Sequence, residues 1–402
     1  MEITQSHQSN QQQTMLMTST NQPTETQFET QCETQCETQC ETQCETQCET
    51  QCETHTESSR KLGSIQMVIE VIKHPNADRL ELATVLGWQV VTRIGEAQVG
   101  DKVIYCEIDG MLPGDAEWLP EAVKGRVAEQ KDTSWYRIKT VKLRKELSQG
   151  LIVPISETIG HMTDYEIGTN VTDELGIKKY EPQNNLFVNV SSGIKFPSHL
   201  LAKTEESRVQ SEPGLLRVLQ SQTYYITVKC DGTSGTYVID PETQELLVCS
   251  RNLVRESPVD EEGITTTPYW YIAKKYNLEE KLKEIGGYYA IQGEICGPGV
   301  QKNLMKLTDL DLFVFNVVDI RDKRLVPYPQ FVKIVKELGL KTVPIEKAGD
   351  KFECDNIKEL LSKAEGKYKN TKNQREGIVI RSQNQDISFK VINNRYLLKH
   401  GY

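Results

Sequence analysis

The chain has 402 residues, 37% of them hydrophobic and 26% charged, with a formal net charge of −10. This length is typical of two or three domains, and the composition excludes a fibrous or wholly disordered protein. Residues 1–58 hold ten of the 57 acidic residues and no Lys, Arg or Asp, so the rest of the chain balances 47 acidic against 47 basic residues and a nucleic-acid partner is not excluded.

Residues 1–60 are rich in Gln, Thr, Ser and Glu, and Glu-Thr-Gln-Cys repeats in tandem from about Glu29 to Thr54. So few apolar side chains cannot offset the entropy of ordering, and we expect a disordered tail. A period of four would align the repeat's cysteines on one side of a helix, which would suit a soft metal or a redox role. A slipped tandem repeat without a role is the favoured interpretation.

The other five of the eleven cysteines are scattered singly, which is not a disulfide framework and indicates a reducing compartment. The chain has no run of 18 apolar residues, and its first residues lack the basic segment of a secretory signal and the arginines of a transit peptide. We therefore expect a soluble intracellular protein, cytoplasmic or nuclear, with no membrane partner.

Short β-rich runs begin at Ile65 and are separated by turns rich in Gly, Pro and Asp, which is typical of a small barrel. The runs are Ile65–Val71, Trp88–Val91 and Lys102–Ile108. The segment His74–Leu80, followed by Gly87-Trp88 and Val99–Val103, resembles the OB-folds of tRNA-binding modules. The resemblance implies an OB-fold nucleic-acid-binding module over residues 65–170.

Four basic residues, Lys139, Lys142, Arg144 and Lys145, are expected on the last barrel strand or at its exit. They would line a face that follows phosphates, or equally form a solvated edge strand. Trp135 and Tyr136 would either stack on bases or, more often for such residues, pack in the core.

A polar stretch from Lys178 to Asn185 separates this module from a second domain, predicted over residues 185–402. Its expected strands follow one another through short turns, which favours an antiparallel α+β domain over a doubly wound sheet. The predicted elements are strands Tyr224–Val228, Thr236–Ile239, Leu246–Cys249 and Phe313–Val318 and a helix Pro329–Leu338. The fold class is therefore α+β, with an N-terminal OB-fold barrel.

The first of these strands ends at Lys229, which Asp231 and Gly232 follow. Nucleotidyl transfer needs a neutral amine, a carboxylate for a metal and a glycine that lets phosphate approach the backbone. A free lysine has a pKa of about 10.4, so a nucleophilic Lys229 is expected to have its pKa lowered by burial or by a neighbouring positive charge. Alone, this four-residue pattern is weak.

Five further motifs follow in order. They are Ser250-Arg251-Asn252, Gln292–Asn303, Leu312–Asn316, Arg375–Arg381 and Ser388–Lys390. Together with Lys229 the set resembles the covalent nucleotidyltransferase superfamily of ATP-dependent ligases and capping enzymes. With an OB-like module in front, residues 65–402 resemble the nick-sealing RNA ligases of the Deinococcus and Naegleria type, and the C-terminal domain would be their adenylyltransferase domain.

The resemblance implies a role for each matching residue. Lys229 would be the nucleophile that carries AMP, Glu294 would bind the ribose hydroxyls, and Phe315 would stack on adenine, although a simple core strand residue is an alternative for Phe315. Arg251 and Lys390 would contact phosphate.

The implied cofactors are ATP and Mg²⁺ or Mn²⁺. Asp231, Glu294 and Glu376 would hold the metal, directly or through its water shell, because hard cations take oxygen ligands. Gly232 would lie against the phosphates. Arg208 is a candidate for the β- or γ-phosphate, with a solvated helix face as an equal alternative.

Two departures affect the choice of nucleotide. Val228 stands where many relatives have a Glu that helps to recognise adenine, and Ile392 stands where phage enzymes have a second lysine. A GTP-using capping enzyme is therefore one alternative, but such enzymes carry an OB domain after the last motif, and only twelve residues follow Lys390. A non-enzymatic RNA or tRNA binder is another, which the intact Lys229 and Glu376 argue against.

We therefore expect a monomeric ATP-dependent RNA ligase that joins 3′-hydroxyl and 5′-phosphate ends. The expected partner is a nicked RNA duplex or an RNA/DNA hybrid whose 3′-hydroxyl strand is RNA. Self-adenylation, transfer of AMP to the 5′-phosphate and attack by the 3′-hydroxyl would be the three steps.

Overall fold

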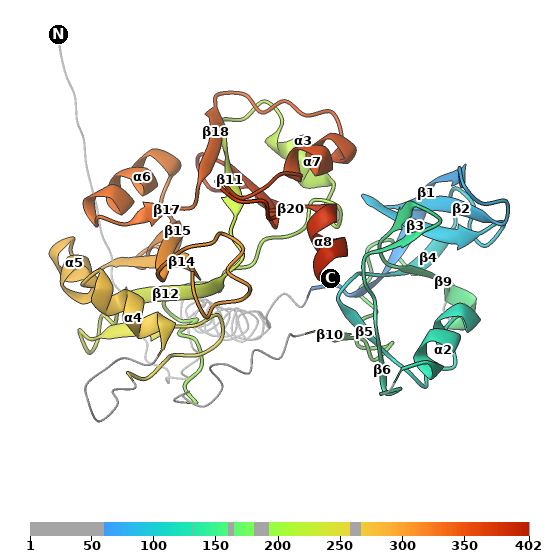
Figure 1. Ribbon diagram of the computed structural model, residues 1–402, viewed down its shortest axis with the longest axis horizontal. Coiled ribbons are helices and arrows are strands. Elements are labelled where there is room, and N and C mark those ends of the chain that lie inside the picture. Colours follow the sequence, from blue (N-terminus) through green and yellow to red (C-terminus); the bar gives the residue numbers. More distant parts are fainter. Residues whose placement is uncertain (1–59, 131, 160–164, 181–192, 258–266, 402) are drawn as a thin grey trace, which may run out of the picture. The chain divides into compact units, whose positions relative to one another are not determined.

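The computed structural model describes residues 60–130, 132–159, 165–180, 193–257 and 267–401 (Figure 1). The chain divides into two units, residues 1–60 and 61–402, and the helices and strands of the described residues all belong to the second. The prediction of a disordered tail over residues 1–60 lies outside the described residues apart from Arg60. No helix in the described ranges is long and apolar enough to cross a membrane.

The front part of this unit is mostly β-structure. Its elements are β1 (Gly63–Lys73), β2 (Leu80–Val85), β3 (Trp88–Arg93), β4 (Lys102–Cys106), β5 (Gly110–Pro113), α2 (Glu121–Ala128), β6 (Trp135–Arg137), β7 (Val141–Leu143), β8 (Glu146–Ser148), β9 (Leu151–Pro154), the 3₁₀ turn η1 (Ile155–Glu157) and β10 (Lys178–Lys179).

Five of these strands form an antiparallel sheet in the order β3-β2-β1-β4-β9. The sheet curls so that β3 meets the segment that leads into β9. The Val91 amide on β3 donates to Ser148 Oγ at the end of β8 at 3.0 Å, and Gln149 N, between β8 and β9, donates to Gln89 O at 2.8 Å. Trp88 and Tyr105 fill the interior, fully buried, with ring centroids 6.3 Å apart. The result is a small closed barrel, as predicted.

One expectation for this barrel is wrong. Lys142 lies on β7, and Arg144 and Lys145 form the turn between β7 and β8, so this basic segment is a separate two-stranded hairpin. The last strand of the barrel is β9, which pairs with β4. Trp135 and Tyr136 are half-buried on β6, where Lys178 Nζ lies 4.3 Å from the centre of the Trp135 ring.

The second part is α+β. Its elements are α3 (Gly214–Leu219), β11 (Tyr224–Lys229), β12 (Thr233–Ile239), β13 (Leu246–Cys249), α4 (Pro268–Lys275), α5 (Leu278–Glu284), β14 (Tyr289–Cys296), β15 (Asp311–Asp319), β16 (Arg324–Leu325), α6 (Tyr328–Glu337), β17 (Lys341–Thr342), β18 (Ile345–Gly349), α7 (Ile357–Ala364), β19 (Gly377–Ser382), β20 (Ser388–Ile392) and α8 (Asn394–His400).

Two sheets make up this part, in the orders β18-β11-β19-β20 and β13-β12-β14-β15-β16. All their strand pairs are antiparallel except β15 with the short β17. Figure 1 shows α4, α5 and α6 beside the second sheet, and their apolar residues share one core with its strands. The predicted antiparallel α+β class is confirmed.

Helix α6 illustrates how the sequence specifies these elements. Proline at its start presets the helical φ, and Phe331, Ile334 and Val335 recur at a spacing of three and four residues. All three are buried against the sheet. The helix predicted at Pro329–Leu338 is thus confirmed to within one residue at each end.

The connection between β11 and β12 fixes the position of the motifs. The chain leaves the first sheet at Lys229, passes through Cys230, Asp231 and Gly232, and enters the second sheet at Thr233. Lys229 pairs with Gly377 on β19, and Ser234 pairs with Glu294 on β14. Residues that are 65 and 147 positions beyond Lys229 therefore meet it at one junction.

Candidate active site

Lys229 and Glu376 are the centre of the junction. Lys229 is the last residue of β11, Glu376 immediately precedes β19, and Lys229 Nζ lies 3.0 Å from the Glu376 carboxylate. Burial acts to lower the pKa of Lys229, but the carboxylates of Glu376, Glu294 and Asp231 outweigh it and raise that pKa above the ordinary lysine value. The predicted lowering is therefore wrong for the protein without a nucleotide, because three carboxylates surround the amine.

The two other carboxylates have pKa values raised toward neutral pH. Burial and the charge of Glu376 raise the pKa of Asp231 to about 6. Burial also raises the pKa of Glu294 to about 7, assisted by Glu376 and Asp231 and opposed by Lys229. Each negative charge thus raises the free energy of the next. A cation or a proton relieves this repulsion, which is the electrostatic condition of a metal-binding position.

The chemistry of these oxygen donors fits Mg²⁺ or Mn²⁺, but they do not form a closed cage. Within the described ranges, no three His, Cys, Asp or Glu side chains are arranged as a ready-made metal site. Glu376 is engaged by Lys229, and Glu294 Oε1 accepts the Gly232 amide at 3.1 Å. Mg²⁺ usually takes one or two carboxylates and completes its shell with water and substrate phosphates, and the residues here suit that arrangement.

A glycine is required at position 232, because the backbone there lies close to Ile295 and Cys296. A Cβ at this position would lie 2.7 Å from Cys296 Sγ and closer still to the Ile295 carbonyl oxygen. No side chain fits between β12 and β14 at this point. The glycine therefore allows the Lys229 turn to lie against Glu294.

Two tyrosines that the sequence did not single out organise the site. The Tyr368 hydroxyl donates to the Lys229 carbonyl at 3.0 Å and accepts the Glu376 amide at 3.2 Å. The Tyr396 hydroxyl, on α8, hydrogen-bonds Asp231 and lowers its pKa. Both residues lie outside the motifs, and only the folded chain brings them there.

Phe315 lies at a β-bulge. On β15, Val314 pairs with Gly293 and Asn316 pairs with Gln292, so Phe315 has no partner across β14. Its carbonyl accepts Arg381 Nη1 at 2.8 Å, and Arg381 in turn pairs with Glu206. Phe313 is buried and Phe315 is half-buried, and both belong to one small apolar cluster with Cys230 and Cys296.

Lys390 and Arg251, the residues predicted to contact phosphate, both have contacts within the protein. Lys390 is half-buried on β20, where its backbone exchanges hydrogen bonds with the segment Ser207–Val209 at 2.8 and 3.1 Å. Arg251 is 46% exposed in the turn after β13 and pairs with Glu205 at 3.0 Å. Glu205 also feels the charge of Lys390, so these basic groups share an electrostatic neighbourhood.

Arg208 is neither helical nor solvated, so the helix-face alternative is wrong. It lies in extended chain that bridges to Lys390 and is 8% exposed. Its Nη2 pairs with Asp109 at 3.0 Å, and Asp109 also pairs with Arg137 at 2.7 Å. A phosphate would have to share or replace the Asp109 contact.

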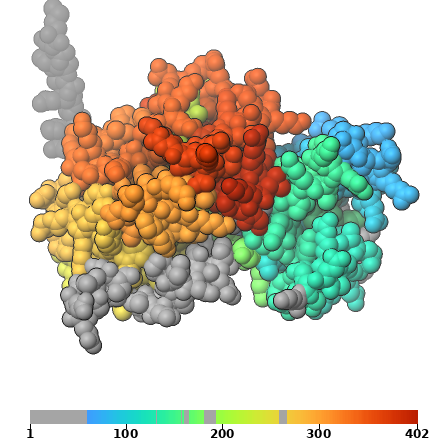
Figure 2. All heavy atoms as spheres, viewed as in Figure 1, coloured from blue at the N-terminus to red at the C-terminus, as the bar shows by residue number. Residues whose placement is uncertain are grey.

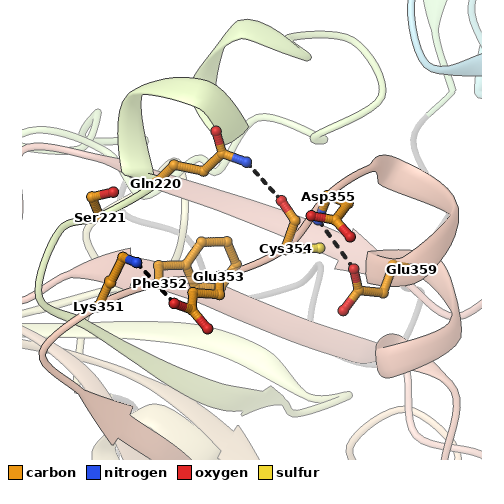
Figure 3. Close-up of a pocket in the computed structure, with 8 residues that line it drawn as sticks. All are labelled: Gln220, Ser221, Lys351, Phe352, Glu353, Cys354, Asp355 and Glu359. Atoms are coloured by element: carbon orange, nitrogen blue, oxygen red, sulfur yellow. Dashed lines mark hydrogen bonds and ion pairs between the residues drawn. The ribbon is translucent and has the colours of Figure 1, made fainter.

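A pocket of about 540 Å³ lies elsewhere, among residues 220–221 and 351–359 (Figure 3). Gln220 Nε2 donates to the Cys354 carbonyl across it at 2.8 Å, and Glu359 accepts the Asp355 amide at 3.1 Å. None of the predicted site residues lines it. It therefore lies apart from the candidate site at the junction around Lys229.

Comparison with known proteins agrees with the fold and the motifs. The RNA ligase family model matches residues 222–392, and an OB-fold domain model matches residues 62–155. The comparison with curated protein sequences gave no match. Both models fall on the parts of the chain where the two folds were predicted.

Solved structures of Naegleria gruberi RNA ligase match nearly the whole described chain. A variant with ATP and manganese is 29% identical with a TM-score of 0.77, over 85% of this chain and 100% of that one. Another variant with ATP and manganese is 30% identical with a TM-score of 0.75, over 85% and 98%. A structure with pyrophosphate is 29% identical with a TM-score of 0.75, over 85% and 99%.

The chain thus combines an OB-fold domain with a following α+β domain that matches the RNA ligase model, and its Lys229 lies among carboxylates at the junction of two sheets. The chain belongs to the RNA ligase family. The predicted resemblance to RNA ligases is confirmed, and so is the predicted enzyme class, an ATP-dependent RNA ligase.

Proposed function

We propose that this enzyme uses ATP to seal 3′-hydroxyl and 5′-phosphate ends at nicks in duplexes whose 3′-hydroxyl strand is RNA. The reaction proceeds through lysyl-AMP and an AMP-capped polynucleotide. The observation that carries the proposal is the Lys229 amine held 3.0 Å from Glu376, with Glu294 and Asp231 acting on the same charge. ATP, AMP, pyrophosphate and manganese are bound by the Naegleria enzyme structures, which supports the same ligands here.

In the first step, the Lys229 nitrogen forms a bond to the α-phosphorus of ATP, and the bond from that phosphorus to pyrophosphate breaks. The amine must first lose a proton, which its raised pKa opposes. Glu376 is the group in contact with that ammonium and is placed to receive the proton or pass it to water. Afterwards the polynucleotide 5′-phosphate takes AMP from Lys229, and the 3′-hydroxyl displaces AMP.

A bound Mg²⁺ or Mn²⁺ would offset charge on the phosphates and compete with Lys229 for the surrounding carboxylates. Asp231, Glu294 and Glu376 would hold it, directly or through water. Burial, together with repulsion from the neighbouring carboxylates, raises the pKa of Asp231 and of Glu294, and this supports the assignment. A carboxylate that turns toward a cation would leave the Lys229 amine more readily neutral.

Residues around the same junction would bind the nucleotide. Phe315, displaced from the ladder by its bulge, would stack on adenine. Glu294 would accept the ribose hydroxyls, and Lys390, Arg251 and Arg208 would contact phosphates as charge moves onto pyrophosphate. Gly232 would let the phosphates approach the backbone.

The front module, proposed over residues 65–170, would hold the duplex around the nick, and the domain of residues 185–402 would carry the chemistry. This division rests on the OB-fold match at residues 62–155 and on the position of the proposed site residues, all of which follow residue 185 and most of which lie between the start of β11 and the end of β20. Five free cysteines among the described residues fit a reducing compartment such as the cytoplasm or nucleus. A monomer remains our prediction.

The test is label transfer from α-labelled ATP to protein, with GTP in parallel, followed by sealing of nicked duplexes with RNA or DNA on each side. We expect Lys229→Ala to give no labelled protein, and wild-type protein to be labelled by ATP in preference to GTP. Persistence of the adduct in Lys229→Ala would refute the nucleophile. Sealing that does not depend on an RNA 3′-hydroxyl strand would refute the proposed substrate.

A further inference from the structure

The β7–β8 hairpin lies at a significant place in the barrel. In OB-folds, oligonucleotides bind to the second and third strands and to the loops that join strands one to two and four to five. In chain order the barrel strands here are β1, β2, β3, β4 and β9, so the hairpin belongs to the connection between the fourth and fifth strands. It also contacts the β1–β2 loop.

The turn of the hairpin has an unfavourable sequence for its conformation. Leu143 pairs with Glu146, which leaves a two-residue turn of Arg144 and Lys145. Their φ angles are 50° and 78°. Positive φ at both positions defines the type I′ turn, in which Asn-Gly is strongly preferred because a Cβ clashes there. Two long cationic side chains thus occupy a turn that Asn and Gly would form more easily.

The rest of the barrel holds this turn in place. His74 is 1% exposed, and its Nδ1 accepts the Asn76 amide at 3.0 Å, so its Nε2 carries the proton and donates to the Leu143 carbonyl at 3.1 Å. Asn76 Nδ2 donates to Glu146 Oε1 at 3.3 Å. Both residues that flank the turn are therefore tied to the β1–β2 loop.

The basic side chains on the hairpin, and Lys139 just before it, are exposed to solvent. Lys139, Lys142, Arg144 and Lys145 are all exposed, and within the described part of the chain none of them makes an ion pair. The nearby carboxylate of Glu146 is engaged by Asn76. Four like charges at one edge repel one another, and an anionic partner removes that cost.

We infer that the β7–β8 hairpin binds the sugar–phosphate backbone of the nicked duplex, with Arg144 and Lys145 at its tip contacting phosphates. The inference rests on the proposed polynucleotide substrate and assigns its binding to a surface outside the Lys229 centre. Contacts of this kind release counterions, so they strengthen binding most at low salt. They fix the position of the duplex without selecting its sequence.

The test replaces the turn by the sequence it prefers, Arg144→Asn with Lys145→Gly, in the full chain. We expect the thermal midpoint to rise, because the turn loses its steric conflict. We expect the Kd for a fluorescent nicked duplex, measured without ATP, to increase on the order of tenfold near physiological salt. The slope of log Kd against log salt should fall by about two, one for each lost phosphate contact.

A matched control removes one lysine charge and one arginine charge from α2 instead, as Lys124→Gln with Arg126→Gln. It should leave the duplex Kd close to wild type, and both variants should be labelled by ATP as wild type is. An unchanged Kd and slope in the Asn-Gly variant, despite its higher thermal midpoint, would overturn the inference, as would an equal loss in the α2 variant. Failure of wild-type protein to take label from ATP would instead overturn the proposed function, and the duplex measurement would still decide the hairpin.

Discussion

Two charged regions of the molecule differ in how their charges are arranged. Around Lys229, one ammonium and three carboxylates meet at the junction of two sheets, where burial and the neighbouring charges shift the pKa values of Lys229, Asp231 and Glu294. On the β7–β8 hairpin and just before it, four basic side chains face solvent without an ion pair in the described ranges. Buried charges act as one unit, so a single change should be severe, whereas exposed charges should add independently and be screened by salt.

The sharpest test of this contrast is Lys229→Arg, which keeps the positive charge beside Glu376 and removes the nucleophilic amine. We expect no covalent AMP adduct, because a guanidinium stays protonated, while the fold and duplex affinity are retained. Label transfer on denaturing gels and the thermal midpoint provide the measurement. An adduct in this variant would mean that another residue carries AMP.

Gly232→Ala should have the next largest effect. The added methyl group meets the Ile295 carbonyl and Cys296 Sγ, so the Lys229 turn must move away from Glu294. A displacement of about 1 Å at a reacting group can reduce the rate on the order of a hundredfold. Single-turnover adenylation measures it, and Gly125→Ala, in α2 with open space around its Cα, is the matched control. Near wild-type adenylation would show that the close approach is not needed.

Tyr368→Phe removes one oxygen from the centre of the site. The Lys229 carbonyl and the Glu376 amide both lose their shared partner. An unsatisfied group costs about 1–3 kcal/mol, so we expect adenylation to slow by roughly tenfold with little change in the KM for ATP. Circular dichroism shows whether the fold is kept. A raised KM with unchanged kcat would place Tyr368 in nucleotide binding instead.

The smallest effect should come from single changes on the hairpin. Arg144→Ala should weaken nicked-duplex binding by several-fold near physiological salt and reduce the salt slope by about one, with adenylation unchanged. Titrations at several salt concentrations measure this. A loss as large as that of the double variant would show that these exposed charges also act as a unit.

Much of the candidate site could be proposed from the sequence, because its residues belong to local patterns. A strand that ends in Lys229, a glycine that follows, and carboxylates at strand positions are visible without a fold. What it missed depends on distant contacts: Asp109 holds Arg208 across 99 positions, and Tyr368 joins two strands from a loop between motifs. The pKa of Lys229 was predicted in the wrong direction because the number of carboxylates around it is a tertiary property.

The front module shows the same limit. Its barrel followed from short alternating runs and turn residues. Lys142, Arg144 and Lys145, however, were expected on the last barrel strand or at its exit, since a two-residue turn made of Arg and Lys lacks the Asn-Gly signal. The bulge that displaces Phe315 was also invisible, because it arises from the register between β14 and β15. Local patterns indicate the elements, and pairing between elements decides the details.

Helix α8 has a practical consequence for anyone who trims this enzyme. The RNA ligase family match ends at residue 392, and every motif residue lies before that point. Yet Asn393 caps α8, and its backbone N–H donates to the Glu376 carbonyl. The helix, dark red on the surface in Figure 2, also brings Tyr396 to Asp231. A fragment cut at the family boundary would keep all the recognisable chemistry and lose the support of two of its carboxylates.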